Sequence, residues 1–277
     1  MPVARLNGVW LRYEVAGEGE LVVMVMGTGS PGRVWQLHQV PALVAAGYRV
    51  ATFDSRGVLA GSRGDSRGGP EAGIEAMTID DMVGDVAALV EHLGGGPARV
   101  VGTSLGAHVA QELALARPDL VRQLVAMAAH ARLDPVQKML TRGEELLHDE
   151  KVQLPAPFRA AVNAVLNLSP ETLRDQPRVT DWLDILELTA APTTAGGRAE
   201  LGVSSQLTDR REAYRAITVP TLVIAFADDV MVPAFLGREV AEAIPGARYA
   251  QVPGTGHFGY LERPEEVNRL MLDFFAG

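Results

Sequence analysis

The sequence contains no cysteine, and lysine occurs only as Lys138 and Lys151. Without cysteine the chain forms no disulfide, has no catalytic thiolate and has no metal site built from cysteine ligands. No run of apolar residues is long enough to span a membrane, and residues 1–5 lack the apolar core of a signal peptide. These absences predict a cytoplasmic protein with no membrane partner.

Clusters of positive charge are missing as well. The 277 residues carry a formal net charge of -9 at pH 7, and lysine and arginine form no basic stripe. Nucleic acid is therefore not expected as a partner. Hydrophobic residues make up 47% of the chain, which at this length predicts one large domain, or one domain with an inserted lobe. The oligomeric state is left open.

Strand and helix patterns alternate over most of the chain. Strands are expected at residues 3–6, 9–15, 21–26, 48–53, 99–103, 120–127, 221–227 and 248–252. Helices are expected between them at residues 35–46, 78–93, 105–116, 234–243 and 264–275. This alternation predicts an α/β fold with a mainly parallel sheet covered on both faces.

The middle of the chain differs, because it has helical segments separated by prolines and no strong strand. These segments lie at residues 136–147, 156–168 and 181–188. We therefore expect a core formed by residues 1–130 and 217–277, with residues 131–216 inserted as a helical cap. Residues 58–77 form a long loop rich in Gly, Ser and Arg, as functional or disordered loops often are.

The most informative motif is Gly102-Thr103-Ser104-Leu105-Gly106, which joins an apolar strand directly to a helix. A serine on so sharp a turn needs glycine on both sides, and the turn exposes its hydroxyl above the sheet. We therefore predict Ser104 as a nucleophile. A second Gly-x-Ser-x-Gly match at residues 64–68 has no strand before it and no helix after it, so we interpret it as a loop.

An activated serine needs a base and a carboxylate that orients the base. His257 is the predicted base, because it lies among glycines directly after a strand and before the last helix. Asp229 is the predicted carboxylate and Asp228 the second choice, since both follow the apolar strand 221–227; Asp134 is a third choice. Among the other histidines, His108 fits helix packing better than catalysis.

An oxyanion hole needs two backbone N–H donors. Leu105, which follows the serine, and Thr28, in the glycine-rich break after the first buried strand, are the predicted pair. The side chains expected to contact a substrate come from this break, the cap and the loops beside the serine and histidine. They are Gly27, His130, Met139, Trp182, Ile185, Leu186 and Phe258.

Taken together, the motifs resemble the α/β-hydrolase superfamily, in its serine-nucleophile branch with a helical cap. The resemblance rests on the Ser104 motif, on Asp54-Ser55-Arg56-Gly57, on residues 229–233, and on Gly256-His257 followed by Glu262-Arg263-Pro264. It implies an eight-stranded sheet, a Ser104–His257–Asp229 triad and no cofactor or metal. Two features depart from it: relatives commonly have His-Gly at Met26-Gly27, and the segment after Gly57 is longer than usual.

We expect a serine hydrolase that cleaves an ester or thioester of a small-molecule apolar acyl substrate through an acyl-enzyme on Ser104. One alternative is an acyltransferase or thioesterase of a biosynthetic pathway whose acyl group is bound to a carrier protein. Others are a carbon–carbon bond hydrolase, a cofactor-free peroxidase-like enzyme and a ligand-binding receptor on the same scaffold.

Overall fold

The computed structural model describes residues 2–56, 74–190 and 193–277. Within them, one sheet of eight strands has the order β1-β2-β4-β3-β5-β6-β7-β8. The strands are β1 (Val3–Leu6), β2 (Val9–Ala16), β3 (Leu21–Val25), β4 (Arg49–Phe53), β5 (Ala98–Thr103), β6 (Val121–Met127), β7 (Thr221–Phe226) and β8 (Arg248–Val252). Among these described strands, β2 pairs antiparallel with β1 and with β4, and the other neighbouring pairs are parallel. The eight-stranded, mainly parallel sheet implied by the resemblance is confirmed.

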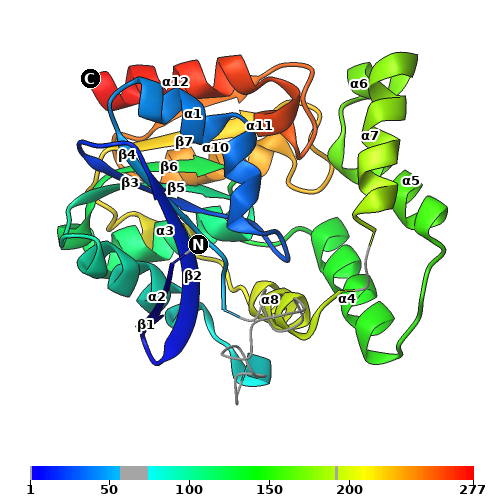
Figure 1. The fold of residues 1–277 in the computed structure, drawn as a ribbon, viewed down its shortest axis with the longest axis horizontal. Helices are drawn as coiled ribbons and strands as arrows, with labels where there is room; N and C mark the ends of the chain where they lie inside the picture. The colour runs from blue at the N-terminus through cyan, green and yellow to red at the C-terminus, as the bar shows by residue number, and fades with distance from the viewer. Residues whose placement is uncertain (1, 57–73, 191–192) are drawn as a thin grey trace.

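Two hydrophobic layers cover the two faces of the sheet. Alternate side chains of β3 point to opposite faces, so Val22 and Met24 join one cluster while Val23 and Val25 join the other. Helices α1 (Gln39–Ala45) and α12 (Pro264–Ala276) cover the first face, and α2 (Ile79–His92) and α3 (Leu105–Ala116) cover the second (Figure 1). Helix α10 (Ala234–Ala243) contributes Leu236 to the first cluster and Val240 to the second. The continuous apolar strands thus reflect burial on both sides.

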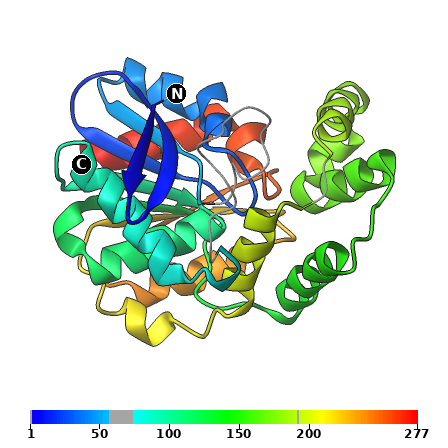
Figure 2. The same ribbon diagram turned by 60° about the horizontal axis from the view of Figure 1, so that its bottom comes forward.

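Between β6 and β7 the described residues form six helices. They are α4 (Pro135–Asp149), α5 (Ala156–Asn167), α6 (Pro170–Arg174), α7 (Gln176–Leu188), α8 (Ala195–Ser205) and α9 (Arg211–Tyr214). Figures 1 and 2 show α4 to α7 standing to one side of the sheet. Helices α5 and α7 share a small core of their own, whereas Val203 of α8 and Tyr214 of α9 belong to a main cluster. The inserted region therefore has an outer part and a part that packs on the sheet's own helices.

Some elements differ from those expected. The helix expected at residues 35–46 is instead a 3-10 helix, η1 (Gly32–Leu37), followed by α1. Pro41 explains the break, because its nitrogen cannot donate to a carbonyl one turn earlier. The expected helices did not include α6, α8, α9 or α11 (Gly259–Glu262). Residues 58–73 of the expected loop, with the whole Gly-x-Ser-x-Gly match at 64–68, lie outside the described residues. The rest of that expected loop contains a short 3-10 helix, η2 (Ile74–Ala76). No helix among the described residues could cross a membrane.

Candidate active site

Ser104 occupies the turn between β5 and α3 with φ 56° and ψ -123°. This positive φ is unusual for a residue with a side chain. It is fixed by close packing on both sides, because a Cβ on Gly102 would overlap the Gly106 carbonyl oxygen, and a Cβ on Gly106 would overlap the Val25 carbonyl oxygen. The two glycines let α3 approach the sheet so closely that Ser104 must stand on a strained turn above it.

His257 and Asp229 come from two further loops at the same edge of the sheet. The Nδ1 atom of His257 lies 2.8 Å from Oδ2 of Asp229, whose side chain is completely buried. The other oxygen, Oδ1, accepts hydrogen bonds from the backbone N–H groups of Met231 and Val232, both at 2.8 Å. These bonds hold the carboxylate in one orientation toward the imidazole. Asp228 is exposed, so Asp229 is the partner of the histidine in this structure.

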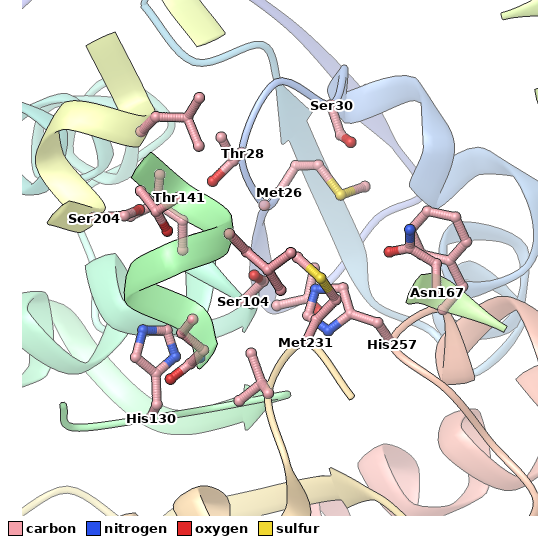
Figure 3. A pocket seen from close by; sticks show the side chains of 18 of the residues that line it. Met26, Thr28, Ser30, Ser104, His130, Thr141, Asn167, Ser204, Met231 and His257 are labelled. Atoms are coloured by element: carbon pink, nitrogen blue, oxygen red, sulfur yellow. The ribbon is translucent and has the colours of Figure 1, made fainter. Parts of the chain in front are cut away.

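Ser104 and His257 both line a cavity of about 280 Å³. Figure 3 shows them with Thr28 around one space, between Ser204 on one side and Asn167 on the other. The core contributes the following lining residues: Met26, Gly27, Thr28, Ser30, Thr103, Ser104, Leu105, His130, Met231, Val232, His257, Phe258 and Tyr260. The inserted region contributes Leu133, Gln137, Leu140, Thr141, Asn163, Asn167, Leu201 and Ser204. No Asp, Glu, Lys or Arg is among these described lining residues.

The two residues predicted to supply the oxyanion hole both border this cavity. Gly27 lies so near the Ser104 turn that a Cβ on it would be 3.2 Å from Cβ of Ser104. The loop that contains Thr28 therefore lies beside the serine. Leu105 starts α3, where the first N–H groups of a helix have no partner within the helix. Their role as oxyanion donors stays a prediction.

Only part of the predicted substrate-binding set reaches the cavity. Gly27, His130 and Phe258 line it. Met139 and Ile185 instead face outward, with 68% and 53% of their surface exposed. Leu186 is buried in the small core of α5 and α7, and Trp182 stacks on Phe258 at 6.1 Å between ring centroids. The helical phase explains the difference, because the face of α4 that carries Leu140 and Thr141 points inward and Met139 does not share it.

Two further histidines lie buried close to the site. Burial, the largest cause, and the neighbouring His108 and His257 together lower the pKa of His130 to about 3. Burial also lowers the pKa of His108 to about 4; its Nδ1 lies 2.9 Å from the Tyr214 hydroxyl. Both imidazoles are therefore neutral at pH 7.

Asp134, the third choice for the carboxylate, caps α4 by accepting from the Gln137 N–H at 2.8 Å.

Glu200 of α8 is a residue near the site that no sequence pattern indicated. Its side chain is buried and accepts a hydrogen bond from the Gly29 N–H at 2.5 Å and another from the Ser55 hydroxyl. Burial, the largest cause, raises the pKa of this carboxyl to about 7. The three glycines of α8 weakened its helical pattern. The signal that could have revealed the helix is Thr194, whose side chain caps it through the Gly197 N–H.

A second buried carboxylate holds the histidine loop. Oε2 of Glu262 accepts from the N–H of Gly256, the residue before His257, at 2.6 Å. Oε1 accepts from the Ser169 N–H at 2.9 Å and from its hydroxyl at 2.8 Å. Glu262 therefore joins the loop of the histidine to the start of α6.

Among the described residues, no group of three or more His, Cys, Asp or Glu side chains could hold a metal ion.

Residues 20–264 match a family model described as alpha/beta hydrolase fold. The chain is 46% identical over 266 residues to "Putative non-heme bromoperoxidase BpoC" of Mycobacterium tuberculosis (strain ATCC 25618 / H37Rv), an alignment that covers 96% of this chain and 97% of that protein. A crystal structure of BpoC from that organism superposes with a TM-score of 0.88 at 45% identity, covering 96% of this chain and 95% of the other.

Two less similar proteins share nearly the full length. "Putative carbamate hydrolase RutD" of Azorhizobium caulinodans is 31% identical over 279 residues, covering 99% of this chain and 98% of that protein. The crystal structure of the enol-lactonase from Burkholderia xenovorans LB400 has a TM-score of 0.81 at 25% identity and covers 100% of both chains. The relatives are thus named for several different reactions.

Proposed function

The chain belongs to the alpha/beta hydrolase family, and from this premise we propose that it is a serine hydrolase that cleaves an ester or thioester through an acyl-enzyme on Ser104. The observation that carries the proposal is the buried Asp229–His257 pair, 2.8 Å apart, which borders the same cavity as the strained Ser104 turn. An imidazole held by a buried carboxylate next to a serine hydroxyl is the arrangement that activates a nucleophile.

In the proposed reaction the same residues act in both halves, the formation of the acyl-enzyme and its hydrolysis. Oγ of Ser104 attacks the substrate carbonyl while Nε2 of His257 takes its proton. Asp229 keeps Nδ1 protonated and stabilises the imidazolium. The N–H groups of Thr28 and Leu105 donate to the oxyanion, each contributing on the order of 3 kcal/mol. His257 then protonates the leaving group, and water attacks the acyl-enzyme by the same steps in reverse.

The cavity favours a small, uncharged acyl group. Around the serine its wall is mainly apolar, with Met26, Leu105, Met231 and Val232. A volume of about 280 Å³ lies at the lower end of the range for ligand pockets, which begins at roughly 300 Å³. The inserted helices add amides and hydroxyls opposite, so a substrate with a hydrogen-bonding group remote from the carbonyl fits better than a purely aliphatic chain.

A second candidate reaction is favoured by the 46% identity to the protein named as a bromoperoxidase. In this reaction hydrogen peroxide, rather than water, attacks the acyl-enzyme, giving a peroxy acid and the free Ser104 hydroxyl. The peroxy acid then oxidises bromide to hypobromite and is itself reduced to the carboxylic acid. This route uses the same triad and differs only in the acceptor.

The test is pre-steady-state hydrolysis of p-nitrophenyl esters with acyl chains from acetyl to octanoyl. We expect a burst of p-nitrophenol equal to the enzyme concentration and none with Ser104→Ala. Ser30→Ala is the matched control, since it also removes a hydroxyl from the cavity wall. Normal turnover by Ser104→Ala would refute the proposal. Adding hydrogen peroxide and bromide to the assay distinguishes water from peroxide as the acyl acceptor, because only the peroxide reaction forms a brominated product.

A further inference from the structure

Glu200 joins three segments that are far apart in the sequence. It lies on α8, it accepts from the N–H of Gly29 in the loop after β3, and it accepts from the hydroxyl of Ser55 just after β4. Its side chain is only 1% exposed. A carboxyl group is costly to bury, so its position between these two donors demands a structural or functional reason.

Hydrogen bonds hold both peptide groups that flank Thr28, and Glu200 accepts one of these bonds. The peptide before it is held at the Gly27 carbonyl, which accepts from the Ser30 N–H at 3.2 Å. The peptide after it is held at the Gly29 N–H by Glu200. Gly29 has φ +68° and Gly27 has no side chain, so the backbone here can rotate freely unless both peptides are fixed.

We propose that Glu200 is a positioning residue for catalysis, which fixes the loop of residues 27–29 so that the Thr28 N–H faces the oxyanion. This proposal rests on the proposed function, because it assigns Thr28 to the oxyanion hole. Glu200 does not touch the substrate in this account and acts only through the loop. Preorganised donors stabilise a transition state because they need no reorientation when charge develops.

The same contact links the cap to the catalytic loop. Leu201 and Ser204, one and four residues after Glu200, line the cavity. On the preceding turn, a Cβ on Gly197 would lie 3.8 Å from the Gly29 Cα. Helix α8 therefore forms part of the substrate wall and also holds the oxyanion loop, so the two depend on one another.

The experiment compares Glu200→Gln, Glu200→Asp and Glu200→Ala. Glutamine keeps an oxygen that can accept from the Gly29 N–H, whereas aspartate is shorter by one methylene and alanine has no acceptor. We expect kcat to fall about 10- to 100-fold in the Ala and Asp variants with little change in KM, and to stay within about threefold of the wild type in the Gln variant. A boronic acid transition-state analogue should bind more weakly by the same factor as kcat falls.

Glu112→Ala is the control for simple loss of stability. Glu112 pairs with Arg210 at 2.8 Å and so also joins a core helix to the inserted region, but it does not line the cavity. It should lower the melting temperature and leave kcat unchanged. If Glu200→Ala does not fold, Glu200→Asp retains the carboxyl and still tests the contact.

Two results would overturn the inference: unchanged kcat and analogue affinity in folded Ala or Asp variants, or a Gln variant as impaired as the Ala variant. These differ from failure of the proposed function, in which Ser104→Ala itself would remain active.

Discussion

At the scale of single residues, the proposed activation of Ser104 depends on the different partners of the two carboxylate oxygens of Asp229. One accepts from two backbone N–H groups and the other faces Nδ1 of His257. An amide in its place would have to point its NH₂ group either at these N–H groups or at the ring. In the second orientation the ring would have to present an unprotonated Nδ1, and Nε2 would then carry the hydrogen and could not accept the serine proton.

Asp229→Asn should therefore lower kcat by about 10³- to 10⁴-fold without unfolding the protein. Asp228→Asn is the matched control, because that neighbouring side chain is exposed and its substitution should leave kcat unchanged. Steady-state kinetics on one p-nitrophenyl ester measures both. Equal losses in the two variants, or a loss only in Asp228→Asn, would contradict the assignment of Asp229.

At the scale of elements, the sequence located those parts whose chemistry is local. The glycines around Ser104 predict a sharp turn, and apolar runs predict buried strands. In the structure Ser104 lies on the turn after β5, and His257 and Asp229 lie on loops at the same edge of the sheet. The lining residues of the inserted region were harder to predict. They depend on how each helix is rotated about its axis, which periodicity alone does not determine. Leu140 and Met139 are adjacent, yet only Leu140 lines the cavity.

The buried position of Glu200 could not be predicted from the sequence for a similar reason. A lone glutamate in a glycine-rich segment is usually a solvent-exposed residue, and its burial arises from the packing of α8 against loops more than 140 residues earlier in the chain. This packing is a long-range property, so no local pattern in residues 195–205 contains it.

The close contact between α3 and the sheet gives a prediction on stability. Gly106→Ala should lower the free energy of unfolding by at least about 2 kcal/mol, because its Cβ would overlap backbone atoms that cannot move aside. Gly143→Ala is the control: a Cβ there, within α4, has nothing within 4 Å, so it should stabilise by roughly 0.5–1 kcal/mol. Urea unfolding of both variants measures the difference, and equal effects would contradict the described packing.

At the scale of the whole molecule, protonation of buried groups links stability to pH. Burial raises the pKa of Glu200 to about 7 from an ordinary value of 4.5, so the folded state binds this proton more tightly than the unfolded state. Its contribution is complete below pH 4.5 and is lost as the pH rises through about 7.

Glu200→Gln removes this titration. Relative to the Gln variant, the wild type should therefore lose on the order of 2–3 kcal/mol of unfolding free energy between pH 5 and pH 8. Urea titrations of both proteins at the two pH values test this. The buried histidines are common to both and cancel in the comparison. A difference that does not change with pH would contradict the raised pKa.

Charge also bears on substrate choice at this scale. The chain has a net charge of -9, and the described lining residues of the cavity include no cationic Lys or Arg to pair with an anion. A neutral ester should therefore have a kcat/KM about 100-fold higher than a matched ester that carries a carboxylate on its acyl group. Added salt should reduce the gap only in part, since burial of the carboxylate is not screened. Preference for the anionic ester would contradict this description.

The most direct test is the reaction of the protein with a fluorophosphonate, followed by intact-mass measurement and peptide mapping. An activated Ser104 predicts one covalent adduct per chain, located on Ser104, and no adduct in Ser104→Ala or His257→Ala. An unmodified wild-type protein, or an adduct on any other residue, would show that this hydroxyl is not the nucleophile.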